Sequence, residues 1–218
     1  MAILNYAPPT NPYLDIIYQD DDILLLNKPS GLLSVPGKAF EHRDSLQTRV
    51  QTVFPTATVV HRLDMATSGL MVMALNKPAH RHISKQFELR ETSKTYIAVV
   101  YGHTAAESGT VDLPLICDWP NRPKQMVDHE RGKKALTHWS VLQRNENSTR
   151  VELKPITGRS HQLRVHMLSL GHPIIGDRLY AHPEALEMAN RLNLHALTLS
   201  FRHPQSEQAL NFETPVPF

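Results

Sequence analysis

The amino-acid sequence predicts an α+β fold whose strands pair mostly antiparallel. Strand-like and helix-like segments are interspersed, but they lack the regular strand–helix alternation that is typical of a parallel sheet. Two strand-like segments flank the polar run RNENS at 144–148, which is typical of a β-hairpin. The sequence has no repeat, low-complexity tract or Gly/Ser linker. We therefore expect a short N-terminal extension over 1–14 and a single domain over 15–218.

The first 60 residues are expected to contain two paired strands and one short helix. The stretch DIIYQDDDILLLNK has two apolar runs on either side of Asp20–Asp22, three residues that favour a turn. This pattern predicts two strands that pair and that end at the turn Lys28–Gly31. A helix is expected near 45–53, because Pro55 prevents a longer one.

The middle of the chain is expected to alternate between strand and helix. The apolar run LMVMAL at 70–75 predicts a buried strand. Asn76 is a typical N-cap, and the helix after it is expected to run to about Phe87 with Pro78 in its first turn. The run TYIAVVYG at 95–102 predicts a further strand.

The C-terminal part is expected to hold a hairpin, two helices and a final strand. The segments 135–143 and 149–156 should form the hairpin. Helices are expected over 160–170 and near 183–192, followed by a strand over 194–201. Three apolar residues of the first of these helices would share one face, and a glycine follows its end: Leu163, Met167, Leu170 and then Gly171.

The composition is that of a globular protein and excludes several classes. Its 218 residues, 41% of them hydrophobic, are enough to fill a core. A single cysteine, Cys117, cannot form an intramolecular disulfide, and the first residues lack the pattern of a secretory signal. No apolar run approaches the roughly 18 to 20 residues that cross a bilayer. We therefore expect a cytoplasmic protein that does not span a membrane.

Basic residues gather in one part of the chain although the net charge of the whole is only +2. Residues 121–164 hold ten Lys or Arg and four Asp or Glu, so this segment carries +6 and the remainder −4. Such a local excess can attract a polyanion through counterion release. A solvated basic face without a partner is the alternative.

The motif HRLD at 61–64 brings a guanidinium close to a carboxylate. In an extended segment Arg62 and Asp64 would share one face, while His61 and Leu63 would share the other. A carboxylate beside a guanidinium is held charged and in place, as a nucleophile or a general base requires. An ordinary ion pair at the end of a strand is the alternative.

The chain resembles the RluA family of pseudouridine synthases over nearly its whole length. Four separate blocks carry the resemblance: LLLNKPSGLLSVPG at 24–37, HRLDMATSGLMV at 61–72, KTYIAVVYG at 94–102 and LKPITGRSHQLRVHMLSLGHPIIGDRLYA at 153–181. A fifth block, DLPLICDWPNRPKQ at 112–125, is similar to the subgroup whose members act on both large-subunit ribosomal RNA and transfer RNA. The resemblance implies the α+β catalytic fold of these isomerases.

The same resemblance implies three catalytic residues. Asp64 corresponds to the catalytic aspartate, Tyr96 to the active-site tyrosine, and Arg164 to the basic partner of the aspartate. The implied reaction detaches uracil from its ribose, rotates the base and rejoins it through carbon. Asp64 would act as the nucleophile, or as a stabiliser and base around a glycal-like intermediate, and both routes stay open. No cofactor and no metal are expected.

The resemblance also implies a structured RNA as the partner, with the target uridine flipped out of its stack. Arg62 would fill the space that the base leaves, so that Arg164 rather than Arg62 would pair with Asp64. Four further residues are expected to contact RNA: Lys28, Lys154, Arg159 and His161. Relatives often carry a separate RNA-binding domain, but only about a dozen residues precede the first strand here. We therefore expect the catalytic domain alone to recognise a stem-loop common to 23S ribosomal RNA and the tRNA anticodon arm. We also expect a monomer.

Several other interpretations remain open from the sequence. An RNA-binding or ribosome-assembly module without activity would keep the basic segment but would not need the three catalytic residues together. A hydrolase such as a nucleosidase would need a second acidic group, which the sequence does not reveal. The thirteen histidines do not show the spacing of a helical zinc site. Trp119 and Trp139 would stack on bases or, as is more usual for tryptophan, pack in the core or against a loop.

Overall fold

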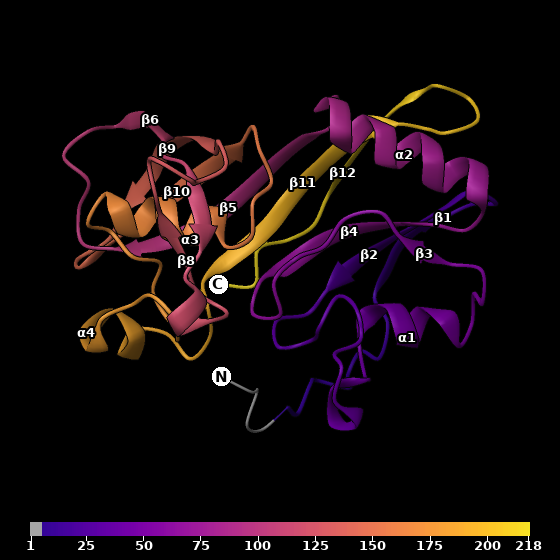
Figure 1. Ribbon diagram of the computed structural model, residues 1–218, viewed down its shortest axis with the longest axis horizontal. Helices are drawn as coiled ribbons and strands as arrows, with labels where there is room; N and C mark the ends of the chain where they lie inside the picture. The colour runs from indigo at the N-terminus through magenta and orange to yellow at the C-terminus, as the bar shows by residue number, and fades with distance from the viewer. Residues whose placement is uncertain (1–5) are drawn as a thin grey trace. The chain divides into compact units, whose positions relative to one another are not determined.

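The computed structural model describes residues 6–218, which form two compact units (Figure 1). Among the described residues, the N-terminal unit comprises 6–94 and 196–217, and the central unit comprises 95–195 and 218. The chain passes between the units within strand β5 (Ser93–Tyr101) and again within strand β11 (Leu194–Arg202). A single domain over 15–218 therefore stays a prediction.

The sheet of the N-terminal unit is built on two buried strands. β2 (Ile23–Lys28) pairs antiparallel with β1 (Ile16–Gln19) on one side and with β4 (Ser68–Ala74) on the other. β4 is buried along its whole length, as its run of apolar residues predicts. Three further strands complete this part of the sheet: β3 (Thr58–Val59) pairs with β4, β11 follows β4 in the strand order, and β12 (Ala209–Glu213) pairs with β11.

The helices of the N-terminal unit begin where the sequence predicts, and Asn76 is the N-cap that was expected. Ser45 caps α1 (Leu46–Gln51) by accepting a hydrogen bond from the backbone N–H of Thr48. Asn76 caps α2 (Lys77–Leu89) by accepting one from the N–H of Ala79.

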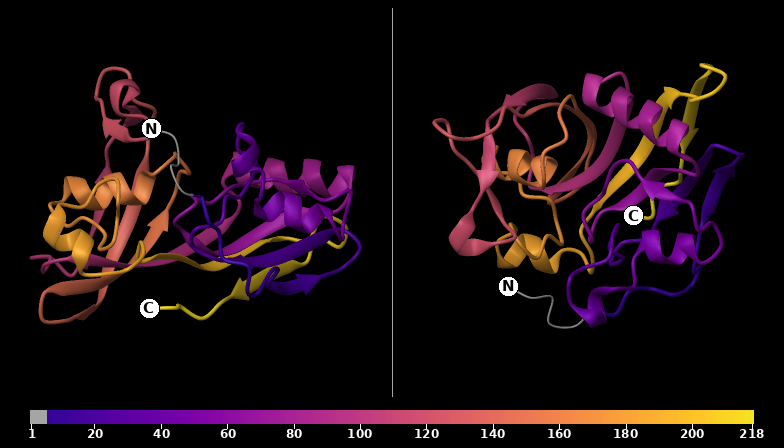
Figure 2. Two further views of the ribbon diagram at one scale, coloured as in Figure 1. Left: turned by 90° about the horizontal axis from the view of Figure 1, so that it is seen from below. Right: turned by 45° about the vertical axis from the view of Figure 1, so that its right-hand side comes forward.

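The core of the N-terminal unit lies between α2 and the sheet. Ile83 packs there with residues of β2, β4 and β11, and Figure 2 shows the helix lying along these strands. Gly69 (φ +113°) permits the close approach of β4 to β11, since a Cβ there would lie 2.3 Å from the carbonyl oxygen of Ala196.

The central unit contains a four-stranded sheet and a small separate hairpin. The sheet has the order β5, β10 (Ser148–Pro155), β9 (Leu136–Arg144) and β6 (Ser108–Asp112), with antiparallel neighbours. β9 and β10 form the hairpin that the run RNENS predicts. The small hairpin consists of β7 (Leu115–Cys117) and β8 (Gln125–Val127), joined through the 3-10 helix η2 (Trp119–Asn121). The remaining elements are α3 (Gln162–Ser169), α4 (Pro183–Glu187) and, in the N-terminal unit, the 3-10 helix η1 (Phe40–His42).

The prediction of an α+β fold with mainly antiparallel pairing is confirmed, but two predicted helices differ in detail. α3 has no apolar stripe, because Gln162, Arg164 and His166 are buried with its apolar residues, whereas Leu170 is 38% exposed. The helix expected near 183–192 ends at Glu187. Beyond it the chain turns at Met188, and the backbone N–H of Asn193 donates to the carbonyl of Ile175. Within residues 6–218, no helix is long and apolar enough to cross a membrane.

Candidate active site

Asp64 lies on the Asp64 loop, residues 60–67, which connects β3 to β4 in the N-terminal unit. Its side chain is half-buried. Ser34 holds the loop from one side, because its hydroxyl donates to the carbonyl of Leu63 (2.6 Å) and accepts from the N–H of the same residue (3.1 Å). The N–H of Thr67 donates to the carbonyl of Asp64 and closes the following turn. The backbone that carries the Asp64 carboxylate is therefore held in place by hydrogen bonds.

Lys28 has a structural role in place of the predicted RNA contact. Its side chain is fully buried at 0% exposure, so RNA cannot reach it in this arrangement. The ammonium group donates to the carbonyl oxygens of Pro29, Leu32 and Met65 at 2.8 to 3.1 Å. A buried charge needs such partners. We call the turn Lys28–Gly31 the KPSG turn. Since Met65 follows Asp64 directly, Lys28 joins this turn to the Asp64 loop.

The KPSG turn contributes two more hydrogen bonds to the Asp64 loop. The N–H of Gly31 donates to the carbonyl of Met65 (2.8 Å), and the hydroxyl of Ser30 donates to that of Ala66 (2.7 Å). Two blocks of sequence more than 30 residues apart thus form one rigid support for the carboxylate.

The four residues of HRLD differ in exposure, and Asp64 and His61 are both half-buried. Leu63 is buried and His61 half-buried, whereas Arg62 is exposed. The contact of Arg62 with RNA stays a prediction.

His61 fixes the start of the Asp64 loop. Its ring stacks on Phe87 of α2, with the ring centroids 4.5 Å apart, and its Nε2 accepts a hydrogen bond from the N–H of Val72 (3.1 Å). Burial, together with the nearby positive charge of Lys94, lowers the pKa of His61 from 6.5 to about 3. His61 is therefore neutral at physiological pH and serves to position the loop.

We expect His61→Gln to weaken the acid sensitivity of the fold. Between pH 6.5 and about 3 the unfolded chain protonates His61 and the folded chain does not, so the free energy of unfolding falls as the pH drops through this range. Above pH 6.5 the group contributes no pH dependence. Urea unfolding at pH 7, 6 and 5 should show a slope smaller by up to about 1.4 kcal/mol per pH unit in the variant. Equal slopes for the two proteins would contradict the neutral, buried state of His61.

In the central unit, Arg164 of α3 is buried and makes a bidentate ion pair with Asp177. Its Nε and Nη2 donate to the two carboxylate oxygens of Asp177, each at 2.7 Å. Asp177 is 1% exposed and also accepts from the backbone N–H of Leu179. The two planar groups match in geometry, which makes this one of the strong kinds of ion pair. The predicted pairing of Arg164 with Asp64 stays a prediction.

Tyr180 connects Arg164 with two neighbouring segments of the central unit. The guanidinium of Arg164 lies 5.0 Å from the centre of the Tyr180 ring. The Tyr180 hydroxyl accepts from the N–H of Gln125 in β8 (2.7 Å) and lies 2.6 Å from Nδ1 of His161. His161 precedes α3 in a left-handed conformation (φ 54°), which is uncommon for a residue other than glycine. This conformation delays the start of the helix to Gln162.

The other predicted residues of the central unit lie on its sheet and on the loop before α3. Tyr96 is half-buried on β5, opposite Leu153 of β10. Lys154 is 55% exposed and pairs with Glu152 (2.6 Å). Arg159 is exposed, and its Nε donates to the carbonyl of Lys134 (3.2 Å). The exposure of Lys154 and Arg159 leaves both able to meet a phosphate, and their contact with RNA, like that of His161, stays a prediction.

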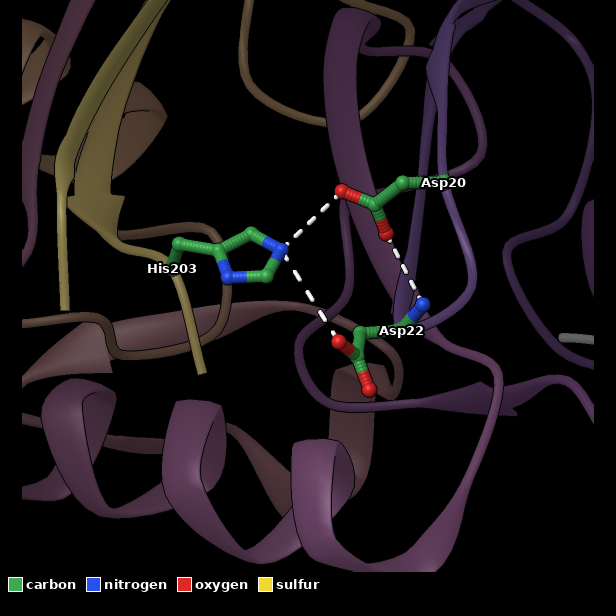
Figure 3. Close-up of side chains that lie close together, drawn as sticks. All are labelled: Asp20, Asp22 and His203. Carbon is green, nitrogen blue, oxygen red and sulfur yellow. Dashed lines mark hydrogen bonds and ion pairs between the residues drawn. The ribbon is translucent and has the colours of Figure 1, made fainter. Parts of the chain in front are cut away.

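One group of possible metal ligands, Asp20, Asp22 and His203, lies in the N-terminal unit (Figure 3). The hydrogen bonds favour an ion-pair cluster over a metal site. Nδ1 of His203 accepts from the N–H groups of Gln205 and Ser206, so the ring proton of the neutral form lies on Nε2. Nε2 points at Asp20 Oδ2 (3.0 Å) and at Asp22 Oδ2 (4.0 Å). A metal ion would have to displace this proton.

The comparisons with known proteins agree with this fold. The sequence model of a family described as RNA pseudouridylate synthase matches residues 22–169. The chain therefore belongs to this family, and it is an isomerase that acts on RNA. The dual-specificity RNA pseudouridine synthase RluA of Escherichia coli K12 is 58% identical over the full length of both chains.

Two further relatives support the assignment. The enzyme of the same name from Yersinia pestis is 60% identical over 93% of this chain and 99% of its own. Among solved structures, human RNA pseudouridylate synthase domain containing 1 has a TM-score of 0.81 and 31% identity, covering 97% of this chain and 87% of that one.

Reasoning from the sequence missed three residues that support the site. Asp177 and Tyr180 stand in the block at 153–181, and Ser34 stands in the block at 24–37. The need for a buried arginine to have a carboxylate partner could have pointed to Asp177. Only the burial of Arg164, which the sequence does not show, makes that need visible.

Proposed function

We propose that this protein converts specific uridines to pseudouridine in a stem-loop common to 23S ribosomal RNA and the tRNA anticodon arm. The 58% identity with a dual-specificity enzyme over the whole chain supports two RNA substrates. The observation that carries the chemistry is the fixed Asp64 loop, which presents one half-buried carboxylate beside the exposed Arg62. The proposed enzyme acts as a cytoplasmic monomer without a cofactor.

In the proposed reaction the bond between N1 of uracil and C1′ of ribose breaks, and a bond between C5 and C1′ forms. C5 loses a proton, and N1 of the rotated base gains one, so the reaction is an isomerisation. Asp64 either attacks the nucleoside covalently, at C1′ or at C6, or stabilises a glycal-like intermediate and moves the proton. Tyr96 packs against the base in the proposed complex, and Arg164 supplies a positive charge near the carboxylate.

A product assay tests this function directly. Transcribed anticodon stem-loop and a fragment of large-subunit ribosomal RNA are incubated with the protein, any pseudouridine is labelled with carbodiimide, and reverse-transcription stops are mapped. A stop at one uridine in each RNA supports the proposal, and an RNA with cytidine at that position is the matched control. Release of free uracil would indicate a hydrolase instead. Unchanged RNA that still binds the protein would indicate a binding module.

We expect Arg62→Ala to impair the use of RNA without weakening the fold. Arg62 is exposed, so its removal should change the free energy of unfolding by less than about 0.5 kcal/mol. In the proposed complex Arg62 fills the space left by the flipped base, and its loss should lower kcat/KM by about tenfold or more. The matched control is Arg81→Ala, which removes another exposed arginine of the N-terminal unit. Equal kcat/KM in the two variants would refute the role of Arg62.

A further inference from the structure

Trp119 is an exposed tryptophan on a loop that carries none of the proposed catalytic residues. It is 64% exposed at the start of η2, between the strands β7 and β8. Tryptophan rarely leaves so much of its surface in water, because burying an aromatic ring is strongly favourable. The other tryptophan, Trp139, follows the usual rule and is 8% exposed.

Arg122 lies against the ring of Trp119. Its guanidinium carbon is 4.5 Å from the ring centre, and its Nε donates to the carbonyl of Trp119 (3.2 Å). Even with this arginine stacked on it, most of the tryptophan surface stays open to solvent. The pair therefore offers an aromatic surface together with a positive charge. We call Trp119 and Arg122 the Trp119 platform.

The loop that carries the platform is held firmly by its own hydrogen bonds. The N–H of Asp118 donates to the carbonyl of Lys124, and the N–H of Asn121 donates back to that of Asp118, both at 3.0 Å. The side-chain amide of Asn121 donates to the Asp118 carboxylate (2.9 Å). In the left view of Figure 2 this loop projects from the rest of the central unit. A surface ordered before binding loses little entropy when a ligand stacks on it.

The platform is also linked to the neighbourhood of Arg164. Gln125, at the start of β8, donates its N–H to the hydroxyl of Tyr180, whose ring lies against the Arg164 guanidinium. One tyrosine therefore joins the base of the platform hairpin to the buried arginine within the same unit. A ligand that extends from the region of Arg164 along this hairpin would meet Trp119.

We propose that the Trp119 platform stacks on an unpaired base of the RNA substrate, other than the uridine that is modified. This proposal rests on the proposed function, which supplies the RNA. An aromatic ring with an adjacent guanidinium suits a nucleotide, since the base stacks on the ring and the cation meets the phosphate. The loop as a whole is not basic, since Arg122 and Lys124 are offset by Asp118 and Asp128 at its two ends. The argument for RNA therefore rests on the exposed ring of Trp119 and the guanidinium of Arg122 that lies against it.

The first test is kinetic. Trp119→Ala should raise KM for the anticodon stem-loop by about 5- to 100-fold, with kcat within about threefold, as expected for the loss of one stacked base. Trp119→Phe keeps an aromatic ring and should restore KM to within about threefold of the original. The control is Leu142→Ala, which removes another exposed apolar side chain of the central unit and should leave KM unchanged. A normal KM in Trp119→Ala, or an effect on kcat alone, would overturn the proposal.

The second test reports on binding without catalysis. In Trp139→Phe the only tryptophan is Trp119, and stacking of a base should quench its fluorescence as stem-loop RNA is titrated in. If saturating RNA did not quench the fluorescence although pseudouridine still formed, the stacking proposal would be overturned and the proposed function would stand. Quenching without any pseudouridine product would uphold the platform and refute the proposed function. If Trp119→Ala abolished self-association and left RNA binding unchanged, the platform would be a protein interface and the proposal would be wrong.

Discussion

Asp64→Asn is expected to lower the turnover of uridine to pseudouridine by more than about 10³-fold. The amide keeps the size of the side chain but carries no negative charge, so it can neither attack the nucleoside nor accept a proton from it. The loop around it is held through backbone atoms of Leu63, Met65 and Ala66, which the substitution leaves in place. RNA affinity should therefore stay within about tenfold of the original. Single-turnover rates and filter binding on the same stem-loop measure the two effects separately.

A matched control for this variant is Asp21→Asn, the same chemical change at an exposed aspartate of the N-terminal unit. Its turnover and its RNA affinity should equal those of the original protein. Turnover above about 1% of the original in Asp64→Asn would remove Asp64 from its proposed role. A large loss of RNA affinity instead would mean that the carboxylate acts mainly in substrate binding.

Asp177→Asn is expected to cause the largest loss of stability. The amide cannot accept both hydrogen bonds of the Arg164 fork, and a buried guanidinium that loses its carboxylate is strongly destabilising. Arg164 is 4% exposed, so water cannot readily replace the lost oxygen. The free energy of unfolding should fall by about 3 to 5 kcal/mol. Turnover should fall as well, at temperatures where the variant is folded, because the position of the guanidinium is no longer fixed.

Two comparisons make this prediction specific. Glu107→Gln breaks the ion pair between Glu107 and Arg144, in which the glutamate is 76% exposed, and should cost less than about 1 kcal/mol. In the double variant Asp177→Asn with Arg164→Met, the buried charge is gone, and part of the lost stability should return. If Arg164→Met lowered the free energy of unfolding by the same amount in Asp177→Asn as in the original protein, the two effects would be additive. Arg164 and Asp177 would then not act as a pair.

Local signals in the sequence predicted most of the secondary structure. Asn76 caps its helix as expected, a helix follows Ser45, and the apolar run at 70–75 forms a buried strand. These outcomes depend on hydrogen bonds and periodicities within a few residues, which the sequence shows directly. The short strands β7 and β8 were not predicted, because segments of three residues are too brief for a periodic pattern to appear.

Reasoning about partners was less successful, since a side chain's partner depends on how distant segments pack. Lys28 looked like a surface cation beside a turn, but it lies buried and donates to three carbonyl groups. The carboxylate that pairs with Arg164 within the central unit, Asp177, was not predicted, although it lies only 13 residues further along the chain. The pairing of Arg164 with Asp64 stays a prediction. Both arrangements arise from loops that meet only in the folded protein.

The sequence by itself determined the family, the α+β class, the caps and the chemical identity of the candidate residues. All of these depend on local backbone preferences or on ordered blocks of residues that persist along the chain. The tertiary structure alone decided that the KPSG turn supports the Asp64 loop, that Asp177 forms an ion pair with Arg164, and that Trp119 is exposed to solvent. The physical reason is that the burial of a side chain and its choice of partner depend on long-range packing. Residue type alone therefore does not decide whether a charged or aromatic side chain lies in the interior or at the surface.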